Sequence, residues 1–190
     1  MQRAIIDGKA VTGITTMYMD VGLDTGDMLL RREVEILEQD NFEDIHDKLG
    51  QCGAELIVRT LDAVANGTAR RIPQNESDAT YAAKITKADC LIDFSKGAKE
   101  VHDLIRGLSP IPLAFTHTPD GRLLKVTSAR VADNKSIGKA GQVLSLDDGI
   151  TVGCGEGAIT LLGVIPEGKS RMSAADFIRG RKVSIGDILN

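Results

Sequence analysis

A long polar segment without hydrophobic periodicity, residues 68–88, divides this chain into two parts of different character. The part before it contains strand and helix patterns, whereas the part after it contains mainly short strand-like pieces. The charge changes sign close to the same place, because residues 1–86 carry 9 basic and 15 acidic side chains and residues 87–190 carry 14 and 12. The net charges of −6 and +2 fit two domains joined by an extended linker.

The part before this segment contains too few elements to bury a core of its own. Residues 11–19 and 28–36 are rich in Val, Ile, Thr, Tyr and Met and partly alternate between polar and apolar side chains, which predicts two strands. One long helix follows them. Because two-stranded units are marginally stable even with helical cover, we expect residues 1–67 to be the last portion of an α/β domain whose earlier strands are missing from this sequence.

The long helix is predicted from one apolar stripe with steps of three to five residues. The stripe is formed by Ile45, Leu49, Cys52, Leu56, Leu61 and Val64. Asp40 is the expected N-cap, with Glu43 three residues later, and Asn66-Gly67 supplies the end.

The part after the segment predicts a helix followed by short antiparallel strands. Ser95 is the expected cap of the helix, and Pro110 follows its end. Gly or Asp-Gly breaks separate strand-like pieces at residues 123–131, 142–146, 150–154 and 158–164. Their spacing predicts a small antiparallel barrel. Ser173 and Asp176 predict the start of a last short helix.

Composition excludes several classes of protein. The hydrophobic fraction is 42% and the mean hydropathy is −0.06, values typical of a soluble globular protein. No apolar run approaches the roughly 20 residues that span a bilayer, and the start of the chain lacks the features of a secretory signal. Cys52, Cys90 and Cys154 are scattered and form no Cys-x-x-Cys, which argues against disulfides and zinc. We expect no membrane attachment and a cytoplasmic setting.

The loop between the two predicted strands is the best candidate for chemistry. Residues 19–29 read Met-Asp-Val-Gly-Leu-Asp-Thr-Gly-Asp-Met-Leu. Glycines there permit backbone conformations that other residues resist, and an acid on a tight connection can be held against a cleft. A calcium loop is excluded because Arg31 stands where its twelfth position needs a Glu. On these residues alone, a solvated turn and a catalytic loop both remain open.

Read together, these segments resemble methionyl-tRNA formyltransferases over nearly all of the chain. The matching pieces are Gln2–Ile5, Thr12–Thr15, Met19–Leu29, Ala79–Ile85, Ile92–Phe94, Ile105–Pro112 and Pro166–Phe177. The Asp-x-Gly-x-Asp-Thr-Gly loop is shared by enzymes that use formyl-tetrahydrofolate. The later pieces are specific to methionyl-tRNA formyltransferases. Ile111 departs from the family, which commonly has an aromatic residue there.

The resemblance implies transfer of a formyl group from 10-formyltetrahydrofolate to the amino group of methionyl initiator tRNA, in translation initiation. The amine attacks the formyl carbonyl, an oxyanion develops, and a proton leaves the nitrogen. The family uses an Asn, a His and an Asp, and the Asp corresponds to Asp24, which would orient the His and help to relay the proton. By the same resemblance Val21, Gly22 and Leu23 line the pterin pocket, and no metal takes part.

The resemblance also implies a fold of class α/β plus all-β. Residues 1–67 would be the distal fragment of a Rossmann-like formyltransferase domain, residues 68–88 a linker, and residues 89–190 a small OB-like antiparallel β-barrel that holds the tRNA acceptor arm through phosphate contacts. The candidate tRNA-binding residues are Lys84, Arg106, Lys169, Arg171, Arg181 and Lys182. Full-length members are expected to be monomers, and a truncated sheet edge would allow association.

The family's Asn and His lie in an upstream His-Ser-Leu-Leu-Pro-type segment that these 190 residues do not contain. The sequence therefore predicts an N-terminally truncated member with negligible formylation by itself. Two alternatives remain open. One is a fragment of a sugar-nucleotide formyltransferase or a formyltetrahydrofolate hydrolase, which share the Asp24 loop, and the other is a non-catalytic RNA-binding module formed by residues 89–190.

Overall fold

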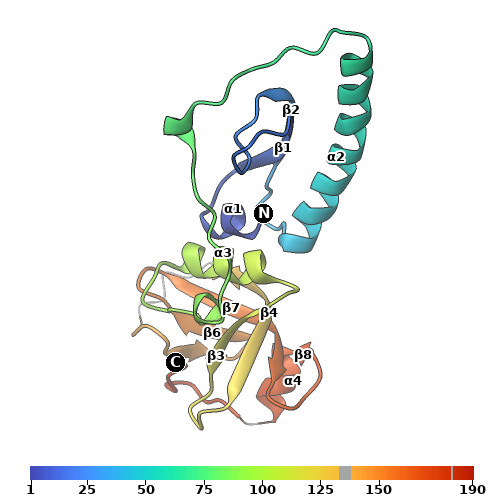
Figure 1. The fold of residues 1–190 in the computed structure, drawn as a ribbon. Coiled ribbons are helices and arrows are strands. Elements are labelled where there is room, and N and C mark those ends of the chain that lie inside the picture. The colour runs from blue at the N-terminus through green and yellow to red at the C-terminus, as the bar shows by residue number, and fades with distance from the viewer. Residues whose placement is uncertain (133–137, 181) are drawn as a thin grey trace. The chain divides into compact units, whose positions relative to one another are not determined.

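The computed structural model describes residues 1–132, 138–180 and 182–190, which form two compact units (Figure 1). Unit 1 consists of Met1 and Lys9–Ala83, and unit 2 consists of Gln2–Gly8 and Lys84–Asn190. The domain boundaries expected from the sequence remain a prediction. Within the described residues, no helix has the length and apolar character needed to cross a membrane.

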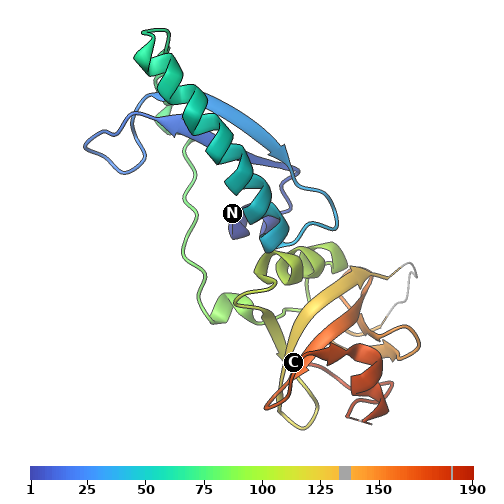
Figure 2. The same cartoon turned by 90° about the vertical axis from the view of Figure 1, so that its right-hand side faces the viewer.

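Unit 1 is a two-stranded antiparallel sheet that packs against one long helix (Figure 2). Strand β1, Val11–Met17, pairs with β2, Met28–Glu35, which confirms both predicted strands. Helix α2, Phe42–Ala65, contacts both strands. Its buried face consists of Ile45, Leu49, Cys52, Leu56 and Thr60, so the predicted stripe is confirmed except at its end, where Leu61 and Val64 are exposed.

The N-cap of α2 is Asn41, so the prediction of Asp40 is wrong by one residue. The Asn41 side chain accepts hydrogen bonds from the backbone N–H groups of Glu43 and Asp44, and the Asp44 carboxylate accepts one from the Asn41 N–H. Asp40 is buried instead and pairs with Lys48 at 2.5 Å. The cap is the residue directly before the first helical turn, since only there can its oxygen reach the free N–H groups.

Unit 2 is built on a six-stranded antiparallel sheet. In spatial order its main path is β3, Ala114–His117; β4, Leu123–Val131; β7, Ala158–Pro166; β6, Ile150–Gly153; and β5, Val143–Ser145. The short strand β8, Met172–Ser173, also pairs with β7. The four predicted strand-like pieces correspond to β4, β5, β6 and β7, whereas β3 and β8 were not predicted.

Among its described residues, unit 2 also contains three α-helices. Helix α3, Ala98–Leu108, packs on β4 and β7, and α1, Gln2–Ile6, packs on α3. The N-cap of α3 is Gly97, whose N–H donates to the Glu100 carboxylate, so the prediction of Ser95 as the cap is wrong. Helix α4, Ala174–Arg179, starts after the predicted cap, Ser173, whose hydroxyl accepts from the Asp176 N–H.

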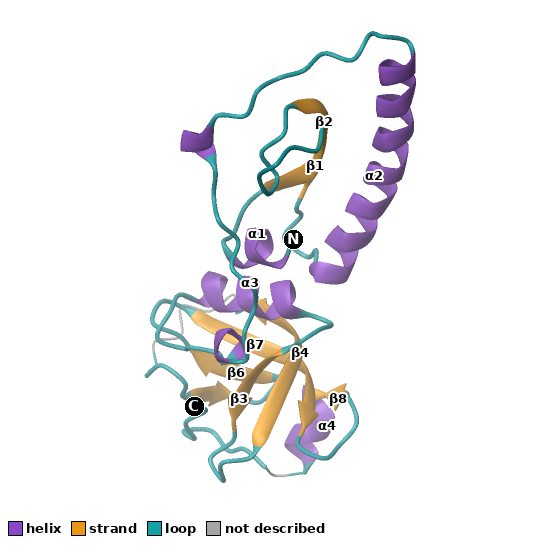
Figure 3. Cartoon of the chain, viewed as in Figure 1, coloured by secondary structure: helices purple, strands orange, loops and turns teal. Residues whose placement is uncertain are grey.

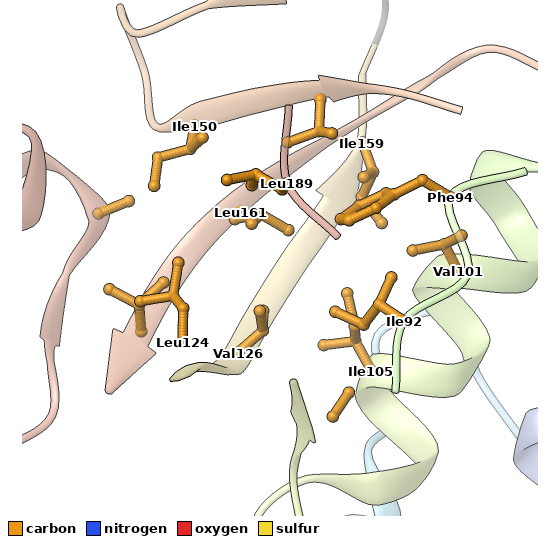
Figure 4. Close-up of a cluster of buried hydrophobic side chains, with 14 of the residues drawn as sticks. Ile92, Phe94, Val101, Ile105, Leu124, Val126, Ile150, Ile159, Leu161 and Leu189 are labelled. Atoms are coloured by element: carbon orange, nitrogen blue, oxygen red, sulfur yellow. The ribbon is translucent and has the colours of Figure 1, made fainter. Parts of the chain in front are cut away.

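The core of unit 2 lies between α3 and the sheet (Figure 4). Val101 and Ile105 come from α3, and Ile150, Ile159 and Leu161 come from the strands; each is at most 2% exposed. Ile6 of α1 packs against the same cluster.

The connection between α2 and α3 is mostly extended, as the sequence predicted (Figure 3). It contains two short 3-10 turns, Glu76–Asp78 and Ala88–Cys90. The part of this connection that precedes the first turn lies beside the loop that joins β1 to β2 in unit 1.

Candidate functional site

The candidate site of unit 1 is the loop that joins β1 to β2. The Tyr18 N–H donates to the Asp27 carbonyl at 3.0 Å and closes the loop. Gly26 is required there, because a Cβ at this position would lie 1.7 Å from the Tyr18 carbonyl oxygen. A Cβ at Gly22 would lie 2.5 Å from Thr25 Oγ1. Both glycines of the sequence motif therefore permit close approaches within the loop.

Asp24 lies in the second half of this loop in a left-handed backbone conformation, with φ of 56°. Among residues other than glycine, Asn and Asp tolerate this conformation best. The residue is exposed, and within the described part of the chain its carboxylate makes no hydrogen bond or ion pair. Asp24 thus presents a free carboxylate on a sharply turned loop.

Three apolar side chains alternate with the polar residues of the same loop. Met19, Val21 and Leu23 are 95%, 103% and 89% exposed. Single exposed apolar residues are common, but three that share one short loop form a surface suited to an apolar or aromatic ligand. Val21 and Leu23, the predicted pterin contacts, are therefore accessible beside Asp24.

An extended segment, residues 71–74, holds both ends of this loop, and we call it the 71–74 strap. Ile72 and Met28 exchange two backbone hydrogen bonds, of 2.8 and 2.9 Å. The Arg71 Nε donates to Asp27 Oδ2 at 2.8 Å, and the Arg71 guanidinium carbon lies 4.7 Å from the centre of the Tyr18 ring. A salt bridge, a cation–π contact and a strand-like pair therefore meet at the base of the loop.

Gln74 of the same strap holds the second half of the loop. Its Nε2 donates to the backbone carbonyls of Asp24 and Gly26, both at 2.7 Å. No local pattern in the sequence indicates this role, because a single glutamine in a polar linker looks like any solvated residue. Only the pairing of Ile72 with Met28 brings Gln74 beside the loop.

In unit 2, two of the predicted tRNA-binding residues lie together. Lys169 and Lys182 line one surface depression, and Arg122, which was not predicted, lines it as well. Lys84 and Arg171 are exposed but do not line this depression. Arg181 lies outside the described residues.

Arg106 differs from the other predicted tRNA-binding residues because it is buried, at 7% exposure. Its Nε donates to Asp103 Oδ1 at 2.7 Å, and Asp103 also pairs with Lys99 at 3.0 Å. A buried guanidinium held by a buried carboxylate is poorly placed for a phosphate contact, since either charge would be costly to leave unpaired. We therefore leave Arg106 out of the proposed tRNA-binding set.

No metal site is evident in the described ranges. Across residues 1–132, 138–180 and 182–190, no three His, Cys, Asp or Glu side chains are arranged to hold a metal ion.

Comparison with known protein families shows which family the chain belongs to. The family model described as "Formyl transferase, C-terminal domain" matches residues 84–182, just over half of the chain, and the model described as "Formyl transferase" matches residues 1–61. The chain belongs to the formyl transferase family. The family assignment confirms the resemblance found in the sequence.

Its relatives include methionyl-tRNA formyltransferases of two bacteria. The protein of Acetivibrio thermocellus is 42% identical over 188 residues, which are 98% of this chain and 60% of that protein. The protein of Symbiobacterium thermophilum is 43% identical over 189 residues, covering 98% of this chain and 58% of that protein. The chain thus spans about three fifths of the length of the curated relatives it matches.

Solved structures share the fold at low sequence identity. HypX from Aquifex aeolicus, in complex with tetrahydrofolic acid, has a TM-score of 0.70 at 19% identity, covering 93% of this chain and 31% of that chain. An N-formyltransferase from Helicobacter canadensis, in complex with folinic acid and dTDP-3-aminofucose, has a TM-score of 0.65 at 18% identity, covering 83% of this chain and 58% of that chain. The prediction of a formyltransferase fold with α/β and antiparallel parts is confirmed at that level.

Proposed function

We propose that this chain supplies the catalytic aspartate, its loop and the C-terminal domain of a methionyl-tRNA formyltransferase. The reaction is formyl transfer from 10-formyltetrahydrofolate to the amino group of methionyl initiator tRNA. The observation that carries the proposal is the free Asp24 carboxylate on a loop that also exposes Val21 and Leu23. The similarity to methionyl-tRNA formyltransferases over 98% of the chain favours tRNA as the acceptor.

The loop fits the formyl donor, which supplies an activated formyl group when bound. Val21 and Leu23 offer apolar contacts to a flat heterocycle, and the Gly22 backbone lies between them without a side chain. The Asp24 carboxylate would orient a histidine and favour its charged form, so that this histidine can take the proton that leaves the amine. The histidine and the asparagine would come from the part of formyl transferases that these 190 residues do not match.

The same proposal assigns tRNA binding to unit 2 and the linker. The antiparallel sheet would form an OB-like barrel, and basic residues of unit 2 and the linker would contact phosphates of the acceptor arm. The proposed contacts are Lys84, Lys169, Arg171, Arg181 and Lys182, to which the shared depression adds Arg122. A cytoplasmic location follows from a role in translation initiation and remains part of the proposal.

A sugar-nucleotide formyltransferase is the second candidate. The Helicobacter canadensis structure, which holds dTDP-3-aminofucose, shares the fold with this chain. Its 18% identity supports the fold alone, whereas the tRNA enzymes are more than 40% identical. Acceptor specificity therefore separates the two candidates.

A formylation assay tests the proposal. The 190 residues are assayed alone, and also joined in frame behind the unmatched amino-terminal part of the Acetivibrio thermocellus relative. We expect negligible transfer to methionyl initiator tRNA by the chain alone and clear transfer by the fusion. In the fusion, Asp24→Asn should lower kcat by about 10²–10⁴, the usual contribution of a proton-transfer group.

Asp20→Asn is the matched control, because Asp20 is a carboxylate of the same loop that bonds to the neighbouring Val21 N–H. We expect it to leave kcat within about threefold, since the amide oxygen preserves that hydrogen bond. Transfer to a dTDP-aminosugar but not to tRNA would establish the second candidate instead. An unchanged kcat in the Asp24→Asn fusion would remove Asp24 from the mechanism.

A further inference from the structure

We propose that Gln74 is a positioning residue for Asp24, acting through the backbone of the catalytic loop. The proposal rests on the function proposed above for Asp24. Gln74 lies in the connection that precedes Lys84, the first residue of the larger segment of unit 2, so the geometry of the loop would depend on the conformation of the linker.

The hydrogen bonds of Gln74 define what it fixes. A glutamine amide nitrogen carries two N–H groups, and here its two short hydrogen bonds go to loop carbonyls at 2.7 Å, whereas a longer contact of 3.8 Å goes to Met17 Sδ. The Asp24 carbonyl belongs to the peptide unit that directly follows the Asp24 Cα, so holding it restricts the Asp24 ψ angle. The Gly26 carbonyl lies two residues on. One side chain therefore clamps the three residues from Asp24 to Gly26.

This clamp acts where the backbone is strained. Asp24 has φ of 56°, a conformation that costs a residue with a Cβ free energy relative to extended or helical backbone. Such conformations persist where surrounding contacts hold them in place. No other group in the described chain donates a hydrogen bond to the Asp24 carbonyl, so the position of this carbonyl depends on Gln74.

The rest of the strap presents Gln74 to the loop. Ile72 pairs with Met28 through two backbone hydrogen bonds, and Arg71 pairs with Asp27. Pro73 then fixes φ between these anchored residues and Gln74. The strap thus holds the residues where the loop meets β2 with Arg71 and Ile72, and the segment from Asp24 to Gly26 with Gln74. This division predicts that loss of the Gln74 amide frees Asp24 while Ile72 stays paired with Met28.

Two substitutions separate hydrogen bonding from packing. Gln74→Leu keeps a side chain of similar size but removes both donors, whereas Gln74→Lys keeps N–H donors on a flexible side chain. Gln51→Leu, at an exposed glutamine of α2, is the matched control. If Gln74 only packs, Gln74→Leu should be tolerated as well as Gln51→Leu.

The first measurement needs no activity. The 190-residue chain is treated with endoproteinase Asp-N, and cleavage before Asp24 is timed. We expect Gln74→Leu to raise the cleavage rate at least tenfold and Gln74→Lys to stay within about threefold of the unmodified chain, because proteases cut loops that open. Equal cleavage of the Gln74→Leu and Gln51→Leu variants would overturn the clamp.

The second measurement tests positioning in the formylating fusion. Gln74→Leu should lower kcat at least tenfold with the KM for methionyl-tRNA within threefold, and Gln74→Lys should recover at least a third of the kcat. In an Asp24→Asn background, Gln74→Leu should have no further effect, since a residue that acts through Asp24 is not additive with it.

The outcomes of the two measurements are distinguishable. Faster cleavage with an unchanged kcat would show that Gln74 holds the loop without positioning Asp24, which overturns this proposal and leaves the function intact. A fusion without mutations that transfers no formyl group would overturn the proposed function and the catalytic role of Gln74 together, while the protease result would still decide whether Gln74 clamps the loop.

Discussion

At the scale of single residues, Cys154 shows how burial sets the chemistry of a side chain. It follows β6 and is 5% exposed. Burial raises the pKa of its thiol to about 11, from the usual value of 9.0. Because the thiolate is the reactive form, the folded protein should hold Cys154 as an inert, neutral thiol up to high pH.

The raised pKa of Cys154 makes the stability of unit 2 depend on pH. In the unfolded chain the thiol ionises near its usual value of 9.0, so the unfolded state binds fewer protons above that pH and the stability falls as pH rises toward 11. Between pH 8 and 10.5 this loss should be about 2 kcal/mol, from 1.36 kcal/mol per pKa unit. Urea unfolding at the two pH values measures it.

Cys154→Ala is the control for this prediction. The substitution lowers stability at every pH by removing a buried group, but it also removes the thiol titration. Between pH 8 and 10.5, the free energy of unfolding of the variant should therefore fall by about 2 kcal/mol less than that of the unmodified chain. Equal losses in both proteins would mean that Cys154 ionises normally when folded.

The candidate site shows which residues a sequence can reveal. Asp24 stood out because its loop combines acids with glycines, and the Tyr18 carbonyl explains why Gly26 must lack a Cβ. Gln74 could not be found in this way. Its role depends on a pairing between Ile72 and a strand more than forty residues earlier, which no local pattern encodes.

At the scale of elements, Gly107 of α3 tests the packing of α1. A Cβ at Gly107 would lie 2.8 Å from Ile6 Cγ1 and 3.3 Å from the Ile6 nitrogen. At Gly50 of α2, a Cβ would meet nothing within 4 Å. Gly50→Ala should therefore stabilise the protein by up to about 1 kcal/mol, as expected inside a helix.

Gly107→Ala should destabilise unit 2 by about 1–3 kcal/mol, because overpacking outweighs the helical gain. Urea unfolding of the Gly50→Ala and Gly107→Ala variants gives the comparison, since the same substitution in two helices should change stability in opposite directions. If both stabilise the protein equally, α1 does not pack on α3.

The length of each element, and the breaks on either side of it, explain which elements the sequence predicts and which it does not. Strands β4 and β7, of nine residues each, are long enough to show a pattern, β5 and β6 are short but lie between Gly or Asp-Gly breaks, and the apolar stripe of α2 extends over several turns. Helix α1, with five residues, is too short to be stable by itself and depends on α3. Strands β3 and β8, of four and two residues, are likewise too short for periodicity to reveal.

At the scale of the whole molecule, each of the two units buries apolar side chains of its own within the part of the chain that the structure describes. Unit 1 buries one face of α2 against β1 and β2, whereas unit 2 buries a larger cluster between α3 and its sheet. The polar segment and the change of charge sign predict two domains joined by a linker, whose boundaries remain a prediction. The sequence could not show that Gln2–Gly8 joins unit 2, because that choice depends on contacts with residues about a hundred positions away.

Two cores predict two unfolding steps, which core substitutions can separate. Leu56 of α2 is 3% exposed in unit 1, and Leu161 of β7 is fully buried in unit 2. Each Leu→Ala change should cost about 2–5 kcal/mol, through lost apolar contact and the cavity left behind. Peptide-resolved hydrogen exchange should show Leu56→Ala accelerating exchange in β1, β2 and α2 alone, and Leu161→Ala in α3 and the strands of unit 2 alone. Since each core is formed within its own unit, the loss of stability in one unit should not accelerate exchange in the other. Acceleration of both units by either substitution would show that they unfold as one.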